Sequence, residues 1–406
     1  MTALQTLAAE VRTELTRDIL PFWAERMQDG NGGFHGRIDG EGRLVPDAPK
    51  GAILNARILW TFAAASRILG DPAWRTVADR AYAQIRGRFY DPVYGGIYWS
   101  LDAAGKPLDG KKQFYAIAFA VYGLAEYYRA TGEEAALQLA QRLYRDIEAH
   151  SLDAEKGGYR EAASRDWSPL SDMRLSEKDR NDAKTMNTHL HILEGYTALY
   201  RVWKDEGLKR SLTTLVQCFL DRIVRPDGHL GLFFDEDWVS QTEQVSYGHD
   251  IECSWLLWET AELLGDPLLM ERVRTCSLRI ADAAIEGLRE DGGIIYESDP
   301  ATGSMDEDRH WWVQAENVVG CLNQYRLRGD SAWLDRALAC WSFIKEHLIC
   351  PDGEWYWSVC ADGTPNLEDD RAGFWKCPYH NGRMCLEIIR RSTSQPSGCG
   401  GSERRQ

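Results

Sequence analysis

The sequence has little of what marks a nucleic-acid-binding, membrane-bound or zinc-binding protein. Its formal net charge is −15 over 406 residues, which argues against nucleic acid or an anionic membrane as a partner, because both are bound through basic patches. No secretory leader and no apolar run of membrane length stand out, so the sequence predicts a cytoplasmic protein. The ten cysteines are scattered and no pair has CxxC spacing, so we expect reduced thiols and no metal site.

No linker rich in proline, glycine or serine divides the chain between Met1 and Ile389. Length alone would allow two or three domains, but barrel folds commonly run long as single units. We therefore predict one catalytic domain over residues 1–391. Residues 392–406 are rich in Ser, Gly, Arg and Gln, and we expect them to form a disordered, dispensable tail.

A turn in which an aromatic or branched residue follows glycine recurs six times. The copies begin 61 to 71 residues apart, and such internal repetition indicates stacked supersecondary units. Glycine supplies the backbone conformations that tight turns need, and the residues after it suit a short hairpin strand. The turns are Gly32-Gly33-Phe34, Gly95-Gly96-Ile97-Tyr98, Gly157-Gly158-Tyr159, Gly228-His229-Leu230-Gly231, Gly292-Gly293-Ile294 and Gly353-Glu354-Trp355.

Two kinds of helix pattern lie between the turns. The more apolar set comprises Ala52 to Leu69, Phe114 to Tyr128, Thr188 to Trp203, Ile251 to Leu264, Trp312 to Leu327 and Asn381 to Ile389. The more charged set comprises Thr2 to Met27, Trp74 to Phe89, Glu134 to Ile147, Lys209 to Ile223, Leu268 to Ile285 and Ala332 to His347. With the apolar set inside and the charged set outside, the pattern predicts an all-α (α/α)6 barrel of about twelve helices. The first helix closes it beside the last, and short β-hairpins lie at one end.

Reactive and aromatic residues recur near the start of successive inner helices, 58 to 74 residues apart. Residues at equivalent positions of a cyclic array point at a shared centre, so we expect a functional site at one end of the barrel. The set is Arg57, Tyr115, His189, His249, Trp312 and His380.

These residue types suit proton transfer on a carbohydrate. Histidine titrates near neutrality, so two histidines can act as acid and base on opposite faces of a substrate. Arg57 offers fixed donors to a developing oxyanion, and Glu252, three residues after His249, can orient that imidazole. Flat faces on which a sugar ring can stack are supplied by Tyr115, Trp312 and Trp375.

The residues alone leave a glycoside hydrolase as the alternative, although the histidines would then lack a role. Such barrels also hold paired carboxylates, and those available here are Asp182, Asp250, Glu252 and Glu316. His191 diverges from His189 on a helix, so we expect a packed or wall residue rather than half of a metal pair. Nothing near Cys377 marks a low-pKa thiol, so we expect it to be structural.

Four segments resemble motifs of the cellobiose 2-epimerases, a branch of the N-acylglucosamine 2-epimerase superfamily. They are Met186-Asn187-Thr188-His189-Leu190-His191, Gly248-His249-Asp250-Ile251-Glu252, His310-Trp311-Trp312-Val313-Gln314-Ala315-Glu316 and Trp375-Lys376-Cys377-Pro378-Tyr379-His380-Asn381-Gly382-Arg383. The resemblance extends from about Ile19 to Ile389 and includes the stretch from Pro49 to Phe62.

This resemblance implies reversible inversion at C2 of a reducing-end glucose, with no cofactor. In that scheme His249 removes the C2 proton of the open-chain sugar, a cis-enediolate forms, and His380 returns a proton to the other face. Arg57 and His189 stabilise the oxyanion, and Glu252 sets the state of His249. Substrate binding is implied for Tyr115, Asn187, Trp312, Glu316 and Trp375.

The expected partner is a neutral sugar, with a β-1,4-linked disaccharide such as cellobiose first, and the expected assembly is a monomer or homodimer. Two alternatives stay open. A monosaccharide 2-epimerase or aldose–ketose isomerase, acting on mannose, glucose or N-acylglucosamine, could use the same residues. A hydrolase or a noncatalytic sugar-binding barrel comes third.

Overall fold

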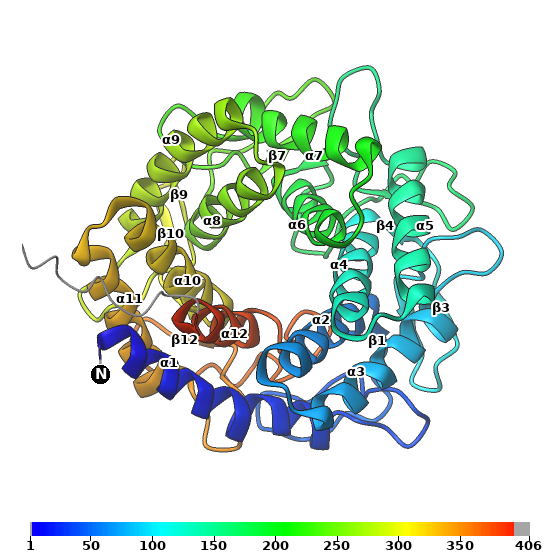
Figure 1. The fold of residues 1–406 in the computed structure, drawn as a ribbon, viewed down its shortest axis with the longest axis horizontal. Helices are drawn as coiled ribbons and strands as arrows, with labels where there is room; N and C mark the ends of the chain where they lie inside the picture. Colours follow the sequence, from blue (N-terminus) through cyan, green and yellow to red (C-terminus); the bar gives the residue numbers. More distant parts are fainter. Residues whose placement is uncertain (1, 394–406) are drawn as a thin grey trace, which may run out of the picture.

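Two concentric rings of α-helices make up most of the computed structural model, which describes residues 2–393 (Figure 1). The inner ring consists of α2 (Ala52–Leu69), α4 (Phe114–Thr131), α6 (Met186–Val202), α8 (Tyr247–Leu264), α10 (Trp311–Arg328) and α12 (His380–Thr393). The outer ring consists of α1 (Ala3–Glu14), α3 (Pro72–Gln84), α5 (Glu134–His150), α7 (Glu206–Cys218), α9 (Pro267–Ala284) and α11 (Ser331–Phe343). The predicted (α/α)6 barrel is confirmed.

The ring closes where α1 packs beside α12, as the sequence predicted. The helix α12 continues to Thr393, beyond the predicted domain boundary at residue 391. The rest of the predicted tail, from residue 394 on, lies outside the described residues. Most outer helices continue into a short π-helical or 3-10 turn, namely Leu15–Ile19, Phe22–Arg26, Ile85–Phe89, Phe219–Ile223, Ile285–Gly287 and Ile344–Leu348.

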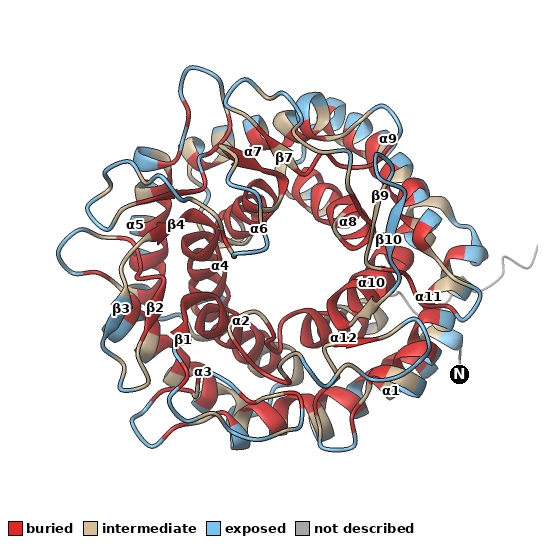
Figure 2. Cartoon of the chain, turned by 180° about the vertical axis from the view of Figure 1, so that it is seen from behind, coloured by how far each residue is buried: buried red, intermediate tan, exposed pale blue. Residues whose placement is uncertain are grey.

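Inner helices are apolar around almost their whole circumference, because they are covered by the outer ring and meet one another around the axis. Figure 2 shows this inner ring buried, with exposure concentrated on outward helix faces and loops. Two glycines allow α2, α4 and α6 to approach closely. A Cβ at Gly123 would lie 2.7 Å from the carbonyl oxygen of Ala56, and one at Gly195 would lie 2.6 Å from that of Ala118.

One inner helix has the length and composition of a membrane span, which the sequence analysis did not anticipate. The 18 residues of α2 have a mean hydropathy of 1.2. Since 78% of this window is buried inside the structure, packing within the inner ring accounts for its apolar character. The nine cysteines among the described residues are free thiols, as expected, and most of them are buried.

A glycine followed by an aspartate joins several inner helices to the next outer helix. Gly70 ends α2 in the left-handed conformation, with φ at 73°. The next residue, Asp71, then caps α3 by accepting a hydrogen bond from the backbone N–H of Ala73 at 2.9 Å. The same glycine conformation and aspartate cap recur at Gly265 after α8 and at Gly329 after α10.

The six glycine turns each close a single antiparallel β-bridge rather than a longer hairpin. In every repeat, a residue one or two positions after the outer helical segment pairs with a residue one or two positions after the turn glycine. The bridges are Gln28–Phe34, Tyr90–Ile97, Leu152–Tyr159, Val224–Leu230, Leu288–Ile294 and Ile349–Trp355. The turn positions were therefore predicted well, but regular strands lie elsewhere.

Short strands link each repeat to the next one. The two residues before an inner helix pair antiparallel with a segment of the following repeat. These pairs are β1 (Lys50–Gly51) with β2 (Ser100–Leu101), β4 (Lys112–Gln113) with β5 (Ala162–Ala163), β6 (Lys184–Thr185) with β7 (Phe233–Phe234), β8 (Val245–Ser246) with β9 (Glu297–Asp299), and β11 (Arg309–His310) with β12 (Ser358–Val359). β3 (Pro107–Asp109) and β10 (Ser304–Asp306) extend two of these sheets. A bridge between Ile38 and Ala372 completes the circle.

Buried lysine–aspartate pairs anchor the inner helices to the glycine turns. Nζ of Lys112, two residues before α4, lies 3.0 Å from Oδ2 of Asp91. The other oxygen of Asp91, Oδ1, accepts the backbone N–H of Val93 in the turn. Lys184 pairs with Asp153 at 2.9 Å in the next repeat. These contacts fix the N-terminal ends of the inner helices, where the site residues lie.

Candidate active site

The N-terminal ends of the inner helices bring five of the six same-phase residues into one cluster. The ring centroid of Trp312 lies 4.8 Å from that of His249 and 5.5 Å from that of His380. A terminal nitrogen of Arg57 donates to the hydroxyl of Tyr115 at 2.8 Å. The positive charge of Arg57 also lowers the pKa of His380, so the two groups are electrostatically coupled.

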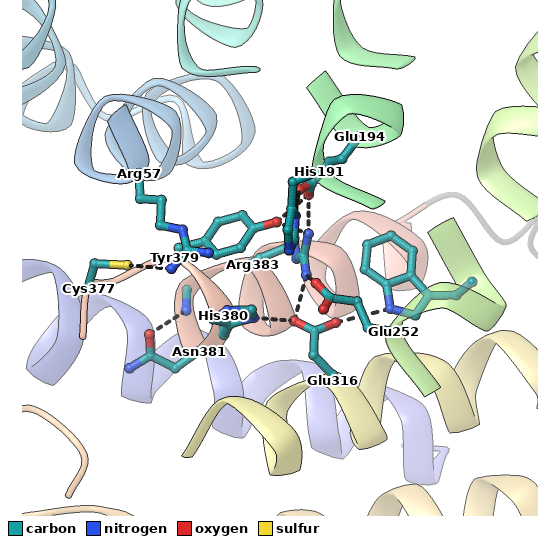
Figure 3. Close-up of polar contacts among 12 residues, drawn as sticks. Arg57, His191, Glu194, Glu252, Glu316, Cys377, Tyr379, His380, Asn381 and Arg383 are labelled. Atoms are coloured by element: carbon teal, nitrogen blue, oxygen red, sulfur yellow. Dashed lines mark hydrogen bonds and ion pairs between the residues drawn. The ribbon is translucent and has the colours of Figure 1, made fainter. Parts of the chain in front are cut away.

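Arg383 on α12 lies at the centre, among glutamates from three other inner helices (Figure 3). It pairs with Glu194 on α6, and its second terminal nitrogen lies 2.5 Å from Glu252 on α8 and 2.6 Å from Glu316 on α10. Burial, and then repulsion from Glu316, raises the pKa of Glu252, and burial raises the pKa of Glu316 against the opposing charge of Arg383. We call Arg383 and its three glutamates the charge hub.

Glu316 fixes the ring of His380, the first residue of α12. Nδ1 of His380 lies 2.7 Å from Oε1 of Glu316, the oxygen that also accepts from Arg383. Because this carboxylate oxygen accepts, Nδ1 carries the proton and Nε2 keeps its lone pair. Burial, and then the charges of Arg57 and Arg383, hold the pKa of His380 well below its usual range. His380 is therefore a neutral imidazole near pH 7, the form that can remove a proton.

A second carboxylate–histidine pair lies on α6, where the sequence analysis expected only a packed or wall residue. Nδ1 of His191 lies 2.9 Å from Oε2 of Glu194, and its ring meets that of Tyr115 edge-on at 4.9 Å. Burial alone would raise the pKa of Glu194, but the Arg383 charge and the His191 hydrogen bond lower it to about 2. His191 is thus oriented by the charge hub in the same way as His380.

His249 lies in the first turn of α8, where Nδ1 is 2.8 Å from the hydroxyl oxygen of Ser246. Burial, and then the neighbouring His191, lowers the pKa of His249 to about 3. The expectation that Glu252 contacts this imidazole is wrong, since Glu252 bonds Arg383 instead. Helical side chains point back toward the N-terminus, which carries His249 to Ser246 while Glu252 reaches across the axis.

Arg57 is buried in an aromatic cage with one donor unused. Its guanidinium carbon lies 4.1 Å from the ring centroid of Phe119 and 4.8 Å from that of Tyr379. Its Nε has no hydrogen-bond partner among the described residues. A terminal nitrogen lies 3.7 Å from the sulfur of Cys377, and burial raises the pKa of that thiol, which suits the structural role predicted for this cysteine.

His189 does not join the cluster, which corrects the role assigned to it from the sequence. Its Nδ1 lies 2.6 Å from the carbonyl oxygen of Thr185, and its Nε2 accepts the backbone N–H of Tyr159 at 2.8 Å. Both ring nitrogens therefore have backbone partners, Nδ1 at the start of α6 itself and Nε2 in the third glycine turn. A residue with no free donor cannot hold an oxyanion, so His191 is the histidine that α6 contributes to the cluster.

Two expected substrate-binding residues each present a group that is available to a ligand. Oδ1 of Asn187, in the first turn of α6, is buried and has no hydrogen-bond partner among the described residues. The ring of Trp375 lies 6.2 Å from that of Tyr115 and 6.0 Å from that of Trp99. Asn187 thus offers a free acceptor, and Trp375 offers a partly exposed aromatic face.

The carboxylates considered for a hydrolase are already engaged. Asp250 lies 2.7 Å from Nδ1 of His229 and also accepts a backbone N–H, while Asp182 pairs with Arg180 at 2.8 Å. The other two belong to the charge hub. Ligand atoms of Glu252, Glu316 and His380 lie within 4.8 Å of one another, a spacing that could hold a metal ion. The guanidinium of Arg383 bonds both of those glutamates and already supplies positive charge there.

The charge hub itself was missed, although the sequence carried a signal for it. Glu194, Glu252 and Glu316 lie 58 and 64 residues apart, which is the spacing of the repeat. Each falls within an apolar inner helix, where a charge requires a partner. Arg383, in the apolar stretch of the last inner helix, is that partner.

Comparisons with known proteins identify the family to which the chain belongs. The model of the family N-acylglucosamine 2-epimerase (GlcNAc 2-epimerase) matches residues 32–382. The cellobiose 2-epimerase of Bacteroides fragilis is 56% identical over 95% of this chain and 99% of its own length, and that of Ruminococcus albus is 42% identical over the same shares. The solved structure of cellobiose 2-epimerase from Bacillus thermoamylovorans superposes with a TM-score of 0.90 at 41% identity, covering 95% of this chain and 100% of that one. The chain therefore belongs to the N-acylglucosamine 2-epimerase family of carbohydrate epimerases.

Proposed function

We propose that this protein is a cellobiose 2-epimerase, which reversibly inverts C2 of the reducing-end glucose of a β-1,4-linked disaccharide without a cofactor. The observation that carries the proposal is the pair His249 and His380, which lie against the same tryptophan ring, Trp312. Each is engaged at Nδ1, which leaves Nε2 for the substrate. Both have a lowered pKa and are neutral near pH 7, so either can act as a base.

The proposed reaction begins with opening of the sugar ring. The C2 proton of the open aldehyde is acidified by the carbonyl at C1, and in the glucose-to-mannose direction His249 removes it. The electron pair moves onto O1 to give a cis-enediolate. Rotation about C2–C3 then presents the opposite face. His380, which takes up a proton from solvent at Nε2 before this step, delivers it to C2 while the C1 carbonyl re-forms, and His249 releases the proton it took to solvent. In reverse, the two histidines exchange roles.

Arg57 is the proposed electrostatic partner of the enediolate. Its Nε is buried and unpartnered among the described residues, so it can donate to a developing oxyanion without breaking an existing bond. Its position against Tyr115 and Phe119 holds the guanidinium rigidly. We assign to His191, rather than His189, the contact of α6 with O1 or O2, because of the two only His191 has a ring nitrogen without a backbone partner. With Nδ1 bound to Glu194, Nε2 of His191 accepts a hydrogen bond from the sugar hydroxyl.

Substrate recognition is assigned to aromatic faces and to one amide. Trp312 and Trp375 offer faces on which the apolar side of a pyranose ring can stack. The unpartnered Oδ1 of Asn187 can accept a hydrogen bond from a sugar hydroxyl. Glu252 and Glu316 act through Arg383 and His380 rather than by direct contact with sugar. A monosaccharide epimerase or an aldose–ketose isomerase would share the enediolate and differ in substrate size or in where the proton returns.

The test is an NMR time course of purified enzyme in D2O with cellobiose, and in parallel with mannose. We expect glucosylmannose with deuterium at C2. Conversion of mannose alone, or formation of a ketose, would reassign the substrate or the reaction class while keeping the histidine chemistry. Product with its original hydrogen at C2 would exclude exchange of that proton with solvent.

Variants test the two-base scheme. His380→Asn should abolish nearly all turnover, because a general acid–base step typically contributes about 10²–10⁴-fold. More than a few per cent of the original rate in a folded variant would contradict the scheme. Exhaustive chelation should leave activity unchanged, and a loss that added metal restores would overturn the cofactor assignment.

A further inference from the structure

The opposite end of the barrel contains a cavity of about 540 Å³. It is lined by the middle and last turns of α8, by the later turns of α10 and α12, by the end of α6 and by the first turn of α1, and α8, α10, α12 and α1 lie side by side along one arc of the barrel (Figure 1). The charge hub is built near the N-terminal ends of these inner helices, whereas the cavity lies at their C-terminal ends. This volume is within the range of sites for small organic ligands, about 300–1,000 Å³.

Three hydrogen-bond donors in the cavity wall have no partner. They are Nδ2 of Asn323 on α10, Nε1 of Trp258 on α8 and Nη1 of Arg391 on α12, and none of the three has a hydrogen-bond partner among residues 2–393. Asn323 is 2% exposed and Trp258 is 8% exposed. Buried polar groups in native proteins are nearly always hydrogen-bonded, because an unpaired one has lost its contacts with water and gained none in return. Three unpaired donors from three helices around one cavity call for an acceptor that they share.

The remaining wall specifies the body and the charge of that acceptor. Apolar surface comes from Trp255, Leu263 and Leu322, among other side chains. Four arginines and two glutamates line the same cavity. Arg201 pairs with Glu259, Arg326 pairs with Glu262, and Arg390 and Arg391 share Glu387, so one positive charge is left in excess. An occupant that complements both features has an apolar body and an anionic head with acceptor oxygens only.

We infer that this cavity is a binding site for a small organic anion, a carboxylate with an apolar or aromatic body. The carboxylate accepts from Asn323, Trp258 and Arg391, and the body packs against Trp255 and the leucines. The site is separate from the central cluster and does not depend on the proposed reaction. Trp255 stands between the two, because its indole N–H also donates to Glu316 at 3.1 Å.

The test uses 4-phenylbutyrate as the probe on the full chain, followed by calorimetry and by quenching of tryptophan fluorescence. We expect saturable binding of 4-phenylbutyrate, and much weaker binding of acetate and of 4-phenylbutanol, which supply the head or the body alone. Binding of the alcohol as tight as that of the acid, or no saturable binding of the acid, would overturn the inference and leave a cavity that holds only water.

Asn323→Leu isolates the donor. This variant removes an unpaired polar group, so it should fold at least as stably as the original chain, yet weaken 4-phenylbutyrate binding by about tenfold or more. Asn317→Leu is the matched control, because its Nδ2 is also buried and unpartnered among the described residues but does not line the cavity. Trp258→Phe, which keeps an aromatic ring but removes the Nε1–H donor, gives a second test of the same kind. Unchanged affinity in both Asn323→Leu and Trp258→Phe would refute the site.

Discussion

Replacing Glu316 by glutamine changes the partner of His380 while preserving its shape. In the native chain Oε1 of Glu316 accepts from His380 at 2.7 Å and from Arg383 at 2.6 Å. A glutamine can turn its NH2 toward Nδ1 of His380. That would move the imidazole proton to Nε2, the nitrogen that receives the substrate proton in the reverse direction and that, as part of an imidazolium, returns it in the forward one. It would also remove the negative charge that stabilises the imidazolium as it forms.

The expected loss follows from these two effects. Wrong tautomer and lost charge together should lower kcat for epimerisation about 10²–10⁴-fold, which corresponds to about 3–5 kcal/mol in the barrier. The free energy of unfolding should fall by a smaller amount, about 1.5–3 kcal/mol, because Arg383 keeps two other carboxylates as partners. The pKa of Glu252 is raised partly by repulsion from Glu316, so Glu252 ionises more readily once Glu316 is neutral.

Initial rates with cellobiose, together with urea unfolding, would measure both quantities. Trp255→Phe is the comparison variant, because it removes the 3.1 Å donor to the other oxygen of Glu316 and leaves His380 untouched. We expect its kcat to fall by less than about tenfold, the value of one hydrogen bond. A Glu316→Gln enzyme that folds normally and retains kcat within about threefold would show that Glu316 does not set the state of His380.

Three further predictions concern stability. His189→Ala should lower the free energy of unfolding by about 2–6 kcal/mol, because two buried backbone groups lose their partner. The kcat per folded molecule should stay within a few-fold of the original, and a folded but inactive variant would return His189 to the mechanism. Burial raises the pKa of Glu161 to about 8 from 4.5, so the folded chain binds a proton that the unfolded chain releases, and stability from this group falls as pH rises between those values. Measured by urea unfolding, the free energy of unfolding of Glu161→Gln should therefore rise relative to that of the original chain by on the order of 4 kcal/mol between pH 4.5 and pH 8. An equal pH dependence of the two chains would contradict the raised pKa of Glu161. Gly123→Ala should lose about 1–3 kcal/mol in thermal or urea unfolding through overpacking, whereas Gly87→Ala, with open space around it, should lose little; equal effects would count against close packing at Gly123.

The helix pattern located every element of the barrel, but it misplaced the start of the helices that carry site residues. α6 begins at Met186 and α8 at Tyr247, two and four residues before the predicted starts at Thr188 and Ile251. The first turns of both helices contain polar side chains such as Asn187 that interrupt the apolar run. Polar residues at a buried helix start are characteristic of a functional site, and there the hydrophobic period is least informative.

The repeat phase identified which inner helices contribute to the site, but it could not choose between neighbouring residues. His189 and His191 are two positions apart, so one turns to the outer layer and the other to the axis. The deciding information was the local pair formed by His191 with Glu194, three residues later. The partner of each glutamate was harder to predict from the sequence, because a charge on α12 meets α6, α8 and α10 only once the ring has closed.

Closure of the ring has a consequence for the order of folding. Glu194, Glu252 and Glu316 belong to the third, fourth and fifth inner helices, whereas Arg383 belongs to the last, whose N-terminal flank joins the first repeat through the bridge between Ile38 and Ala372. A partial barrel without α12 would hold three carboxyls facing one another with no cation among them, and their repulsion would keep the gap open. When the last helix docks, Arg383, His380 and the bridge between Ile38 and Ala372 come into place at the same time. The assembly of the candidate active site and the closure of the ring, which requires contacts between residues far apart in the sequence, are thus expected to be one event.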